Sequence, residues 1–443
     1  MVKKQKQILI INPPVYDFAA FDLWAKPLGI LYLSSILKEN GIEVKMLDYM
    51  DRYLEDPLSV SDKYGCGHYK KIRTDKPAIY KDIPRYYSRY GLQKEKAENY
   101  LKNLSCDLNF RPDIILMTSV MTYWYPGVYE AVKTVKNIFP HIPLVLGGTY
   151  ATLCPEHAGG SDADYIIEGG FNALNEIFKK TGIYITMPES FSSFPAPDFS
   201  YYEKSEYAVL RMSMGCPFRC PYCAQDVLCG KIYEIKPWDK VFDEIKTLAN
   251  SGKKNMVFYD DALFYNCEIA IKPLLRRIIK EKLDIKIHTP NGLHARYLDK
   301  ELALLMKSAG FIMPRFSLET ADTKMQKKTG SKVSNEIYIN AMRFLRDAGY
   351  KSGEYLTYLL IGMPGQKLED VKDSIKFANS LGSKVSLSEY SVIPRTKDFL
   401  KADKKFAEEP LYHNKSVYPL FNLDEWDDIR GIKSLAIKMN SLL

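Results

Sequence analysis

The sequence predicts an α/β protein of two domains: a doubly wound parallel sheet first, then an open partial barrel of six strand–helix units. The chain has 443 residues, which is too long for one ordinary core. Its strand candidates are continuous apolar runs, as expected of parallel strands that helices cover on both faces. Helical patterns separate these strands, which favours parallel sheets.

The first domain is expected at residues 1–186. Its first strand, QILIINPP, precedes a helix that has Pro27 near its start and Gly41 just past its end. Further strands are predicted in VKMLDY, PDIILMTSV, PLVLGG and ADYIIEGG. Ligands of such sheets bind beyond the carboxyl ends of the strands, and small or polar residues stand at these ends here.

An insertion at about 51–108 is expected to interrupt this sheet after its second strand. Its middle, residues 63–92, interleaves basic residues with tyrosines. Three interpretations stay open. It is a solvated cap, a lid over a large anionic or aromatic ligand, or a surface for nucleic acid. We do not expect nucleic acid as a partner.

The second domain is expected at residues 205–398, after a linker at 187–204 that is rich in Pro, Ser and Phe. Its six strand candidates are YAVLRMS, NMVFYDD, IKIHTP, MPRFSLE, EYLTYLLIGMPG and KVSLSEY. Six units are too few for a closed eightfold barrel, so the chemistry is expected in the loops after the strands of an open one. Residues 399–443 are predicted to form a short, partly helical tail.

The composition predicts a cytoplasmic protein without a membrane span. No apolar stretch has the length that crosses a membrane, and the N-terminus lacks a signal-peptide pattern. The net charge of +8 permits a phosphate-bearing ligand without demanding nucleic acid. Eight cysteines in so long a chain do not make a disulfide scaffold, and clustered cysteines in a reducing compartment indicate metal binding or catalysis.

Three cysteines fall within eight residues, directly after the first strand of the second domain: Cys216, Cys220 and Cys223. A structural zinc ion needs four protein ligands, and the fourth would have to be Cys229 or the remote Cys267. An iron–sulfur cluster suits the spacing better, because thiolates are its usual ligands. Three thiolates would hold three corners of a cubane and leave one iron open for a ligand.

This loop, MGCPFRCPYCAQD, resembles the motif of the radical S-adenosylmethionine (radical SAM) enzymes, with an aromatic residue before the last cysteine. The resemblance covers about residues 205–395. It implies a four-iron, four-sulfur cluster whose open iron takes S-adenosyl-L-methionine. One electron would cleave the sulfonium and yield a 5′-deoxyadenosyl radical, which abstracts hydrogen from an unreactive carbon. An electron donor such as flavodoxin or ferredoxin is implied, and the substrate is left open: a small molecule, a lipid or a peptide.

The resemblance also implies side chains that meet S-adenosylmethionine. Tyr222 would pack near the adenine. Asp260 and Asp261 stand where many members carry a Gly-Gly-Glu that meets the amino group, although acidic residues at strand ends are often helix caps. Glu319 could reach the ribose hydroxyls or the amino group, or form an ion pair with a nearby base.

Two further strand ends carry candidates. The backbone at Gly362 and Met363 could line the adenine, as the resemblance implies. His288, Asn291 and His294 follow the third strand of this domain and could face the substrate, although a lone histidine is more often structural.

The first domain is similar to the cobalamin-binding domain of one large subset of these enzymes, with NPP after its first strand, TS after its third and LGG after its fourth. Glycine at such ends lets the backbone approach a bulky ligand. The histidine that ligates cobalt in the Asp-x-His-x-x-Gly signature is absent, so either cobalt lacks that ligand or the domain binds no corrinoid. The matching positions are Thr118, Ser119, Gly147, Gly148, Thr149 and Gly169.

The leading hypothesis is a cobalamin-dependent radical SAM enzyme, with methyl transfer to an unactivated carbon favoured. One alternative is a corrinoid-free radical SAM enzyme that performs a rearrangement, a cyclisation or a sulfur insertion. Another is a non-catalytic iron–sulfur or metal-binding protein. The cysteines expected to be dispensable for the cluster are Cys66, Cys106, Cys154, Cys229 and Cys267.

Overall fold

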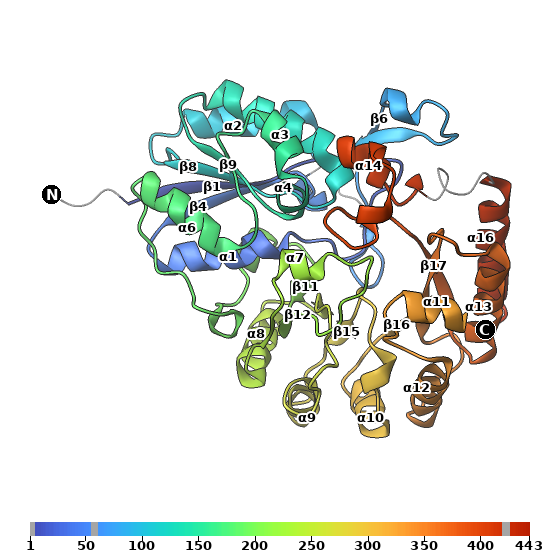
Figure 1. The fold of residues 1–443 in the computed structure, drawn as a ribbon. Helices are drawn as coiled ribbons and strands as arrows, with labels where there is room; N and C mark the ends of the chain where they lie inside the picture. Colours follow the sequence, from blue (N-terminus) through green and yellow to red (C-terminus); the bar gives the residue numbers. More distant parts are fainter. Residues whose placement is uncertain (1–4, 55–60, 419–425) are drawn as a thin grey trace. The chain divides into compact units, whose positions relative to one another are not determined.

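The computed structural model describes residues 5–54, 61–418 and 426–443, so parts of the expected insertion (55–60) and tail (419–425) lie outside the described residues. The chain divides into two compact units (Figure 1). Unit 1 comprises Met1–Ser205 and Ala407–Tyr412, and unit 2 comprises Glu206–Phe406 and His413–Leu443. A short piece of the C-terminal region therefore belongs to the first unit.

Unit 1 is built on a five-stranded parallel sheet with the strand order β10-β9-β8-β1-β4. The order reverses between β1 and β8, and at such a switch point the carboxyl ends of the strands leave a crevice for ligands. All five strands fall in the runs that the sequence predicts. They are β1 (Gln7–Asn12), β4 (Glu43–Asp48), β8 (Ile114–Met117), β9 (Leu144–Leu146) and β10 (Tyr165–Ile166).

Helices cover both faces of this sheet (Figure 1). Successive residues of β1 enter two different cores: Leu9 and Ile11 pack with α2 and α3, whereas Ile8 and Ile10 pack with α1 and α6. Both faces are therefore apolar, which explains why the strands show no polar alternation. The helices are α1 (Leu28–Glu39), α2 (Lys94–Ser105), α3 (Tyr125–Ile138), α4 (Thr149–Leu153), α5 (Pro155–Ala158) and α6 (Phe171–Lys180).

Small antiparallel sheets occupy part of the range 51–108 and pair it with residues that follow β1. One sheet has the order β2-β7-β6, and β3 pairs with β5 in another. The end of the range is α2, whose buried Ala97, Leu101 and Leu104 make it the crossover helix between β4 and β8. The strands are β2 (Val15–Asp17), β3 (Phe21–Asp22), β5 (Gly67–His68), β6 (Lys71–Thr74) and β7 (Tyr87–Tyr90).

Unit 2 contains six parallel strands in two sheets, with the orders β11-β14-β15 and β16-β17-β18. Single bridges, Ile287 with Phe311 and Leu293 with Phe316, connect the two sheets into one open row. The predicted partial barrel of six strands, and with it the predicted fold class, is confirmed. The strands are β11 (Tyr207–Leu210), β14 (Asn255–Phe258), β15 (Lys286–His288), β16 (Arg315–Glu319), β17 (Leu356–Ile361) and β18 (Lys384–Glu389).

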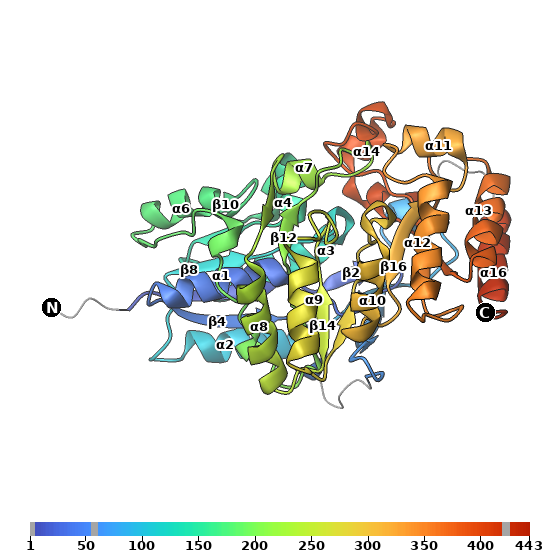
Figure 2. The ribbon, with the colours of Figure 1, turned by 90° about the horizontal axis from the view of Figure 1, so that it is seen from below.

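A row of helices covers the outer side of these strands (Figure 2). The last helix packs on α13 and β18, where the Asn440 side chain accepts from the Val385 N–H (2.7 Å) and donates to its carbonyl (2.8 Å). The edge strand of the row is thereby protected. The helices of unit 2 are α7 (Gln225–Leu228), α8 (Trp238–Asn250), α9 (Ile271–Lys280), α10 (Lys300–Ser308), α11 (Thr323–Lys328), α12 (Asn335–Asp347), α13 (Leu368–Ser380) and α16 (Trp426–Asn440), and α14 (Lys405–Glu408) begins in unit 2 and ends in unit 1.

None of the helices in the described part of the chain combines the length and the apolar character needed to cross a membrane.

Candidate functional site

The three clustered cysteines lie in the connection between two short antiparallel strands, β12 (Ser213–Gly215) and β13 (Tyr233–Ile235). Gly215, directly before Cys216, has a φ of 88°, a conformation that favours glycine. A Cβ atom there would lie 2.1 Å from the carbonyl oxygen of Ile232. The chain therefore fixes both ends of the cysteine loop by backbone contact.

Asp260, at the end of β14, holds the segment that leads into this loop. Its Oδ1 accepts from the N–H groups of Met212 (3.1 Å) and Ser213 (2.5 Å) and from the Ser213 hydroxyl (2.6 Å), and its Oδ2 accepts from the Met212 N–H (3.2 Å). Burial raises the pKa of this carboxyl group to about 6. Asp260 is thus engaged by the chain itself and acts on the position of the loop.

Asp261 is more accessible than its neighbour, and it faces different partners. The Arg211 guanidinium lies 3.6 Å from its carboxylate, and the amide of Gln225 donates to it. The same amide lies 3.3 Å from the Sγ of Cys229. Burial raises the pKa of Asp261 and that of the Cys229 thiol. Gln225 and Arg211 therefore join the site, although no sequence motif singled them out.

The Sγ atoms of the three loop cysteines do not all lie within 4.8 Å of one another. Among the described residues, the group of three potential ligands whose donor atoms all lie within 4.8 Å of one another is a different one, around Cys267. Thiolates on one tetrahedral zinc ion would lie roughly 3.8 Å apart, given a Zn–S bond of about 2.3 Å. All three cysteines are free. Three thiols on one loop suit an iron–sulfur cluster, because thiolates are its usual ligands.

The loop thiols resist ionisation in the absence of a metal. Burial raises the pKa of Cys216 and Cys220, and it raises that of Cys223 to about 11, although the residue as a whole is exposed. A coordinating metal reverses this preference, because a thiol bound to it is deprotonated. The donor set is therefore neutral when empty and anionic when loaded.

Glu319, at the end of β16, lies beside the cysteine loop. It is buried, with a φ of 67° that is unusual for a non-glycine residue, and the register of β16 shifts just before it. Its Oε1 accepts from the Nζ of Lys332 (2.5 Å) and from the Tyr222 hydroxyl (3.3 Å). The predicted candidates Tyr222 and Glu319 are thus brought together, and Lys332, which sequence reasoning missed, joins them.

The end of β17 is held by one side chain. Gln366 Oε1 accepts from the N–H groups of Gly362 (2.9 Å) and Met363 (3.2 Å), and Met363 is buried. Both backbone N–H groups therefore already donate to a side chain of the protein. A ligand here would meet the van der Waals surface of the turn.

The three polar residues after β15 have different surroundings. The Nε2 of His288 lies 2.9 Å from the Asn255 Oδ1 in the core, and Asn291 donates to the Tyr259 carbonyl (2.9 Å). His294 packs on Phe218 of the cysteine loop, with ring centres 4.9 Å apart, and burial lowers its pKa to about 3. Of the three residues, His294 packs its ring against an aromatic side chain of the cysteine loop.

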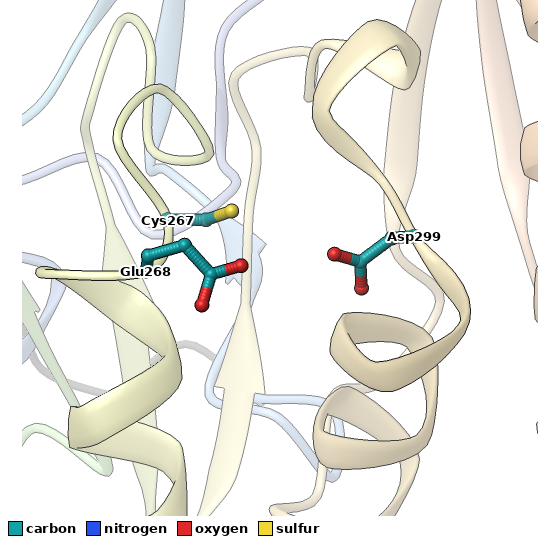
Figure 3. A group of neighbouring side chains, drawn as sticks. All are labelled: Cys267, Glu268 and Asp299. Carbon is teal, nitrogen blue, oxygen red and sulfur yellow. The ribbon is translucent and has the colours of Figure 1, made fainter.

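The group around Cys267 includes the ammonium of a buried lysine. Cys267, Glu268 and Asp299 point toward one another from the segments before α9 and α10 (Figure 3). The buried Nζ of Lys272 lies 2.5 Å from Glu268 and 2.7 Å from Asp299. Asp299 also caps α10 by accepting from the Leu302 N–H (2.7 Å). The carboxylates therefore neutralise an ammonium group.

In unit 1, the predicted crevice residues lie at the carboxyl ends of β8, β9 and β10. Ser119 and Gly148 pack tightly, because a Cβ on Gly148 would lie 2.3 Å from the Ser119 carbonyl oxygen. Ser119 donates to the Gly147 carbonyl (2.6 Å), and its own carbonyl accepts from the Thr149 N–H (2.8 Å). These contacts fix the turns around the crevice.

An apolar cavity of about 150 Å³ lies beside these turns. Thr118, Gly147, Gly148 and Gly169 line it, whereas Ser119 and Thr149 do not. A Cβ added at three of its glycines would meet no atom within 4 Å, so these glycines keep space open rather than allow close packing. The three are Gly29, Gly169 and Gly170.

Comparison with known proteins identifies unit 2. Residues 210–378 match the model of the Radical SAM superfamily. The chain contains a radical SAM domain. The resemblance inferred from the cysteine loop is thereby confirmed. The matched range begins at the last residue of β11 and ends within α13, so it includes the cysteine loop and five of the six strand ends.

Two curated relatives of the radical SAM chain are named methyltransferases. A protein of Pyrococcus horikoshii, named an uncharacterized methyltransferase, is 25% identical over 85% of this chain and 79% of its own length. The cytidylyl-2-hydroxyethylphosphonate methyltransferase of Streptomyces wedmorensis is 21% identical over 99% of this chain and 90% of its own.

Solved structures share the fold of both units. The radical SAM methyltransferase TsrM of Kitasatospora setae, described with cobalamin and a [4Fe-4S] cluster bound, has a TM-score of 0.66 at 16% identity and covers 91% of this chain and 78% of its own. The cobalamin-dependent radical enzyme OxsB has a TM-score of 0.58 at 14% identity over 91% of this chain and 56% of its own. At these identities the likeness establishes the fold.

Replacement of Gly215 by alanine is expected to lower the stability of the protein by about 1–3 kcal/mol, because the new Cβ meets a backbone carbonyl and the conformation is strained. Gly230→Ala is the matched control. Gly230 lies on the same loop at a φ of 75°, but its added Cβ would meet no atom within 4 Å. Thermal unfolding of the metal-free proteins measures both, and an equal loss in the two variants would contradict the assignment.

The carboxyl group of Asp260 is expected to make stability fall as the pH rises. Its pKa is about 6 in the folded protein and about 4 in an unfolded chain, so the folded state binds the proton more tightly. The free energy of unfolding should therefore decrease, by up to about 3 kcal/mol, between pH 4 and pH 6. Asp260→Asn should remove this part of the pH dependence, as denaturant unfolding at several pH values would show. If stability depends on pH in the same way in Asp260→Asn as in the wild type, the assignment to Asp260 is contradicted.

Proposed function

We propose that this protein is a cobalamin-dependent radical SAM methyltransferase that acts on an unactivated carbon of a small molecule. The cysteine loop would hold a [4Fe-4S] cluster through Cys216, Cys220 and Cys223. When bound, the cluster and S-adenosylmethionine would supply a 5′-deoxyadenosyl radical, and the corrinoid would supply a methyl carrier.

The observation that carries the proposal is the set of three cysteines on one loop of a radical SAM domain. Thiolates are the usual ligands of a cubane cluster, and three of them leave one iron for another ligand. The proposal assigns no metal to Cys229, whose Sγ accepts from the Gln225 amide (3.3 Å).

The cavity of unit 1 suits one part of a corrinoid. Open space beside Gly29, Gly169 and Gly170 and the apolar walls of the cavity suit a bulky, largely apolar part of a ligand. The likeness in fold to two structures described with cobalamin bound supports this assignment. The boundaries of a corrinoid domain at about 1–186 and a radical SAM core at about 205–398 belong to the same proposal.

The residues around the cysteine loop would bind and orient S-adenosylmethionine. Asp261 offers the accessible carboxylate for its ammonium group, since Asp260 is engaged by the backbone of the loop. Tyr222 and Glu319 would meet the nucleoside part, and the turn at Gly362 and Met363 would line the adenine. A flavodoxin or ferredoxin as reductant and a cytoplasmic location complete the proposal.

A corrinoid-free reaction such as sulfur insertion is the second candidate, because relatives named for methylthio products or methylthio transfer also match. The tRNA-2-methylthio-N(6)-dimethylallyladenosine synthase of Clostridium novyi is 25% identical over 65% of this chain and 60% of its own length. Relatives named methyltransferases match over more of this chain, which favours the first candidate.

Anaerobic reconstitution tests the proposal. The full chain is expected to bind about four iron, about four sulfide and one cobalt when supplied with iron, sulfide and hydroxocobalamin. It should form 5′-deoxyadenosine or S-adenosylhomocysteine under reduction. Single Ala variants of Cys216, Cys220 and Cys223 should lose the iron and the activity, while Cys229→Ala keeps both. Iron without cobalt would favour the second candidate, and iron loss in Cys229→Ala would refute the ligand assignment.

Gly29→Leu is expected to lower cobalamin affinity at least tenfold without loss of stability. The new side chain would enter the cavity, whereas a glycine inside a helix costs about 1 kcal/mol relative to better helix formers. Gly431→Leu is the control, since Gly431 lies in α16 with equally open space but outside the cavity. Titration of cobalamin absorbance and thermal unfolding measure both, and unchanged affinity in Gly29→Leu would contradict the placement.

A further inference from the structure

A turn far along the chain approaches the cysteine loop. Gly330, after α11, has a φ of 103°, and an added Cβ would lie 3.5 Å from the Cα and 3.6 Å from the Sγ of Cys220. The turn thus borders this thiol directly. Glycine is suited to it because the φ is positive and the neighbour is close.

Lys332 follows two residues later and is largely buried, with 11% of its side chain exposed. Its ammonium lies 2.5 Å from Glu319 Oε1, whose side chain is 10% exposed. Tyr222, between Cys220 and Cys223, donates to the same oxygen (3.3 Å). A buried ion pair is therefore joined to the cysteine loop through Tyr222. The burial of the ion pair matters because a buried charge affects its neighbours more strongly than a charge that water screens.

Arg296 holds the backbone of this turn in place. Its Nε donates to the Lys332 carbonyl (3.0 Å) and its Nη2 to the Ser331 carbonyl (2.7 Å). The guanidinium also lies 5.8 Å from the ring centre of Phe218, within the cysteine loop. The position of Lys332 relative to the loop is thus fixed from two sides.

We propose that Lys332 is a positioning residue that sets a positive charge beside the Cys220 thiolate and thereby raises the reduction potential of the cluster on the loop. The inference rests on the proposed function, since it needs the cluster. Reduction adds one negative charge, so a nearby cation stabilises the reduced form, and charges and hydrogen bonds around an iron–sulfur cluster set its potential. Glu319 keeps the buried ammonium charged and limits its effect.

The test is the midpoint potential of the reconstituted full chain without S-adenosylmethionine, followed by electron paramagnetic resonance during a redox titration. Lys332→Met should shift the potential to more negative values, and Lys332→Arg should keep it near that of the wild type. Glu319→Gln should shift it in the opposite direction. Lys327→Met, which removes an exposed lysine of α11, is the matched control and should leave it unchanged.

An unshifted potential in Lys332→Met at full iron content would overturn the inference. If that variant fails to fold or to hold iron, the double variant Glu319→Gln/Lys332→Met is used, because it removes both charges and leaves no unpaired carboxylate. The midpoint potential of the double variant should be more negative than that of Glu319→Gln alone. Equal potentials in these two variants would also overturn the inference. A wild-type chain that binds no cluster refutes the proposed function instead, so the two failures are distinct.

Discussion

The arrangement of unit 2 depends on shaping a loop with three thiols before any metal is bound. A thiol that loses contact with water resists ionisation, and the pKa values of all three are raised by burial. The loop must therefore be shaped by contacts other than metal bonds. Gly215 supplies a backbone turn against Ile232, and Asp260 holds the preceding segment through the amides of Met212 and Ser213.

Glycine has two distinct uses in this fold. Gly148 and Gly215 allow backbone segments to approach so closely that a Cβ would lie 2.3 Å and 2.1 Å from a carbonyl oxygen. Gly29 and Gly170 have no such neighbour, and their missing side chains leave the cavity of unit 1 open. The first use fixes the geometry of a turn, whereas the second provides room for a ligand.

Buried lysines are likewise used in two ways. Lys272 is surrounded by Glu268, Asp299 and Glu301, so its charge is fully matched and it ties the segments around α9 and α10 together. Lys332 pairs with Glu319, which also accepts from the Tyr222 hydroxyl of the cysteine loop. The first lysine ties helical segments together, whereas the second lies beside the cysteine loop.

The sequence alone determined the order of the parallel strands in both units, because continuous apolar runs are local patterns. It also determined the cysteine loop, whose spacing is a property of eight consecutive residues. The sequence did not reveal that Lys94–Ser105 is a crossover helix of the sheet. It lies within the expected insertion, because basic residues and tyrosines precede it without a clear boundary. The family assignment followed from the loop and its position after a strand.

Only the tertiary structure decided how the neighbours of that loop share their roles. Asp260 and Asp261 are adjacent and chemically identical, yet one is buried against backbone amides and the other faces Arg211 and Gln225. Lys332 carries no motif, since the groups that give it a role lie on distant parts of the chain. Side chains from separate strand ends meet only when the parallel strands align, and this convergence is a property of packing that no local pattern encodes.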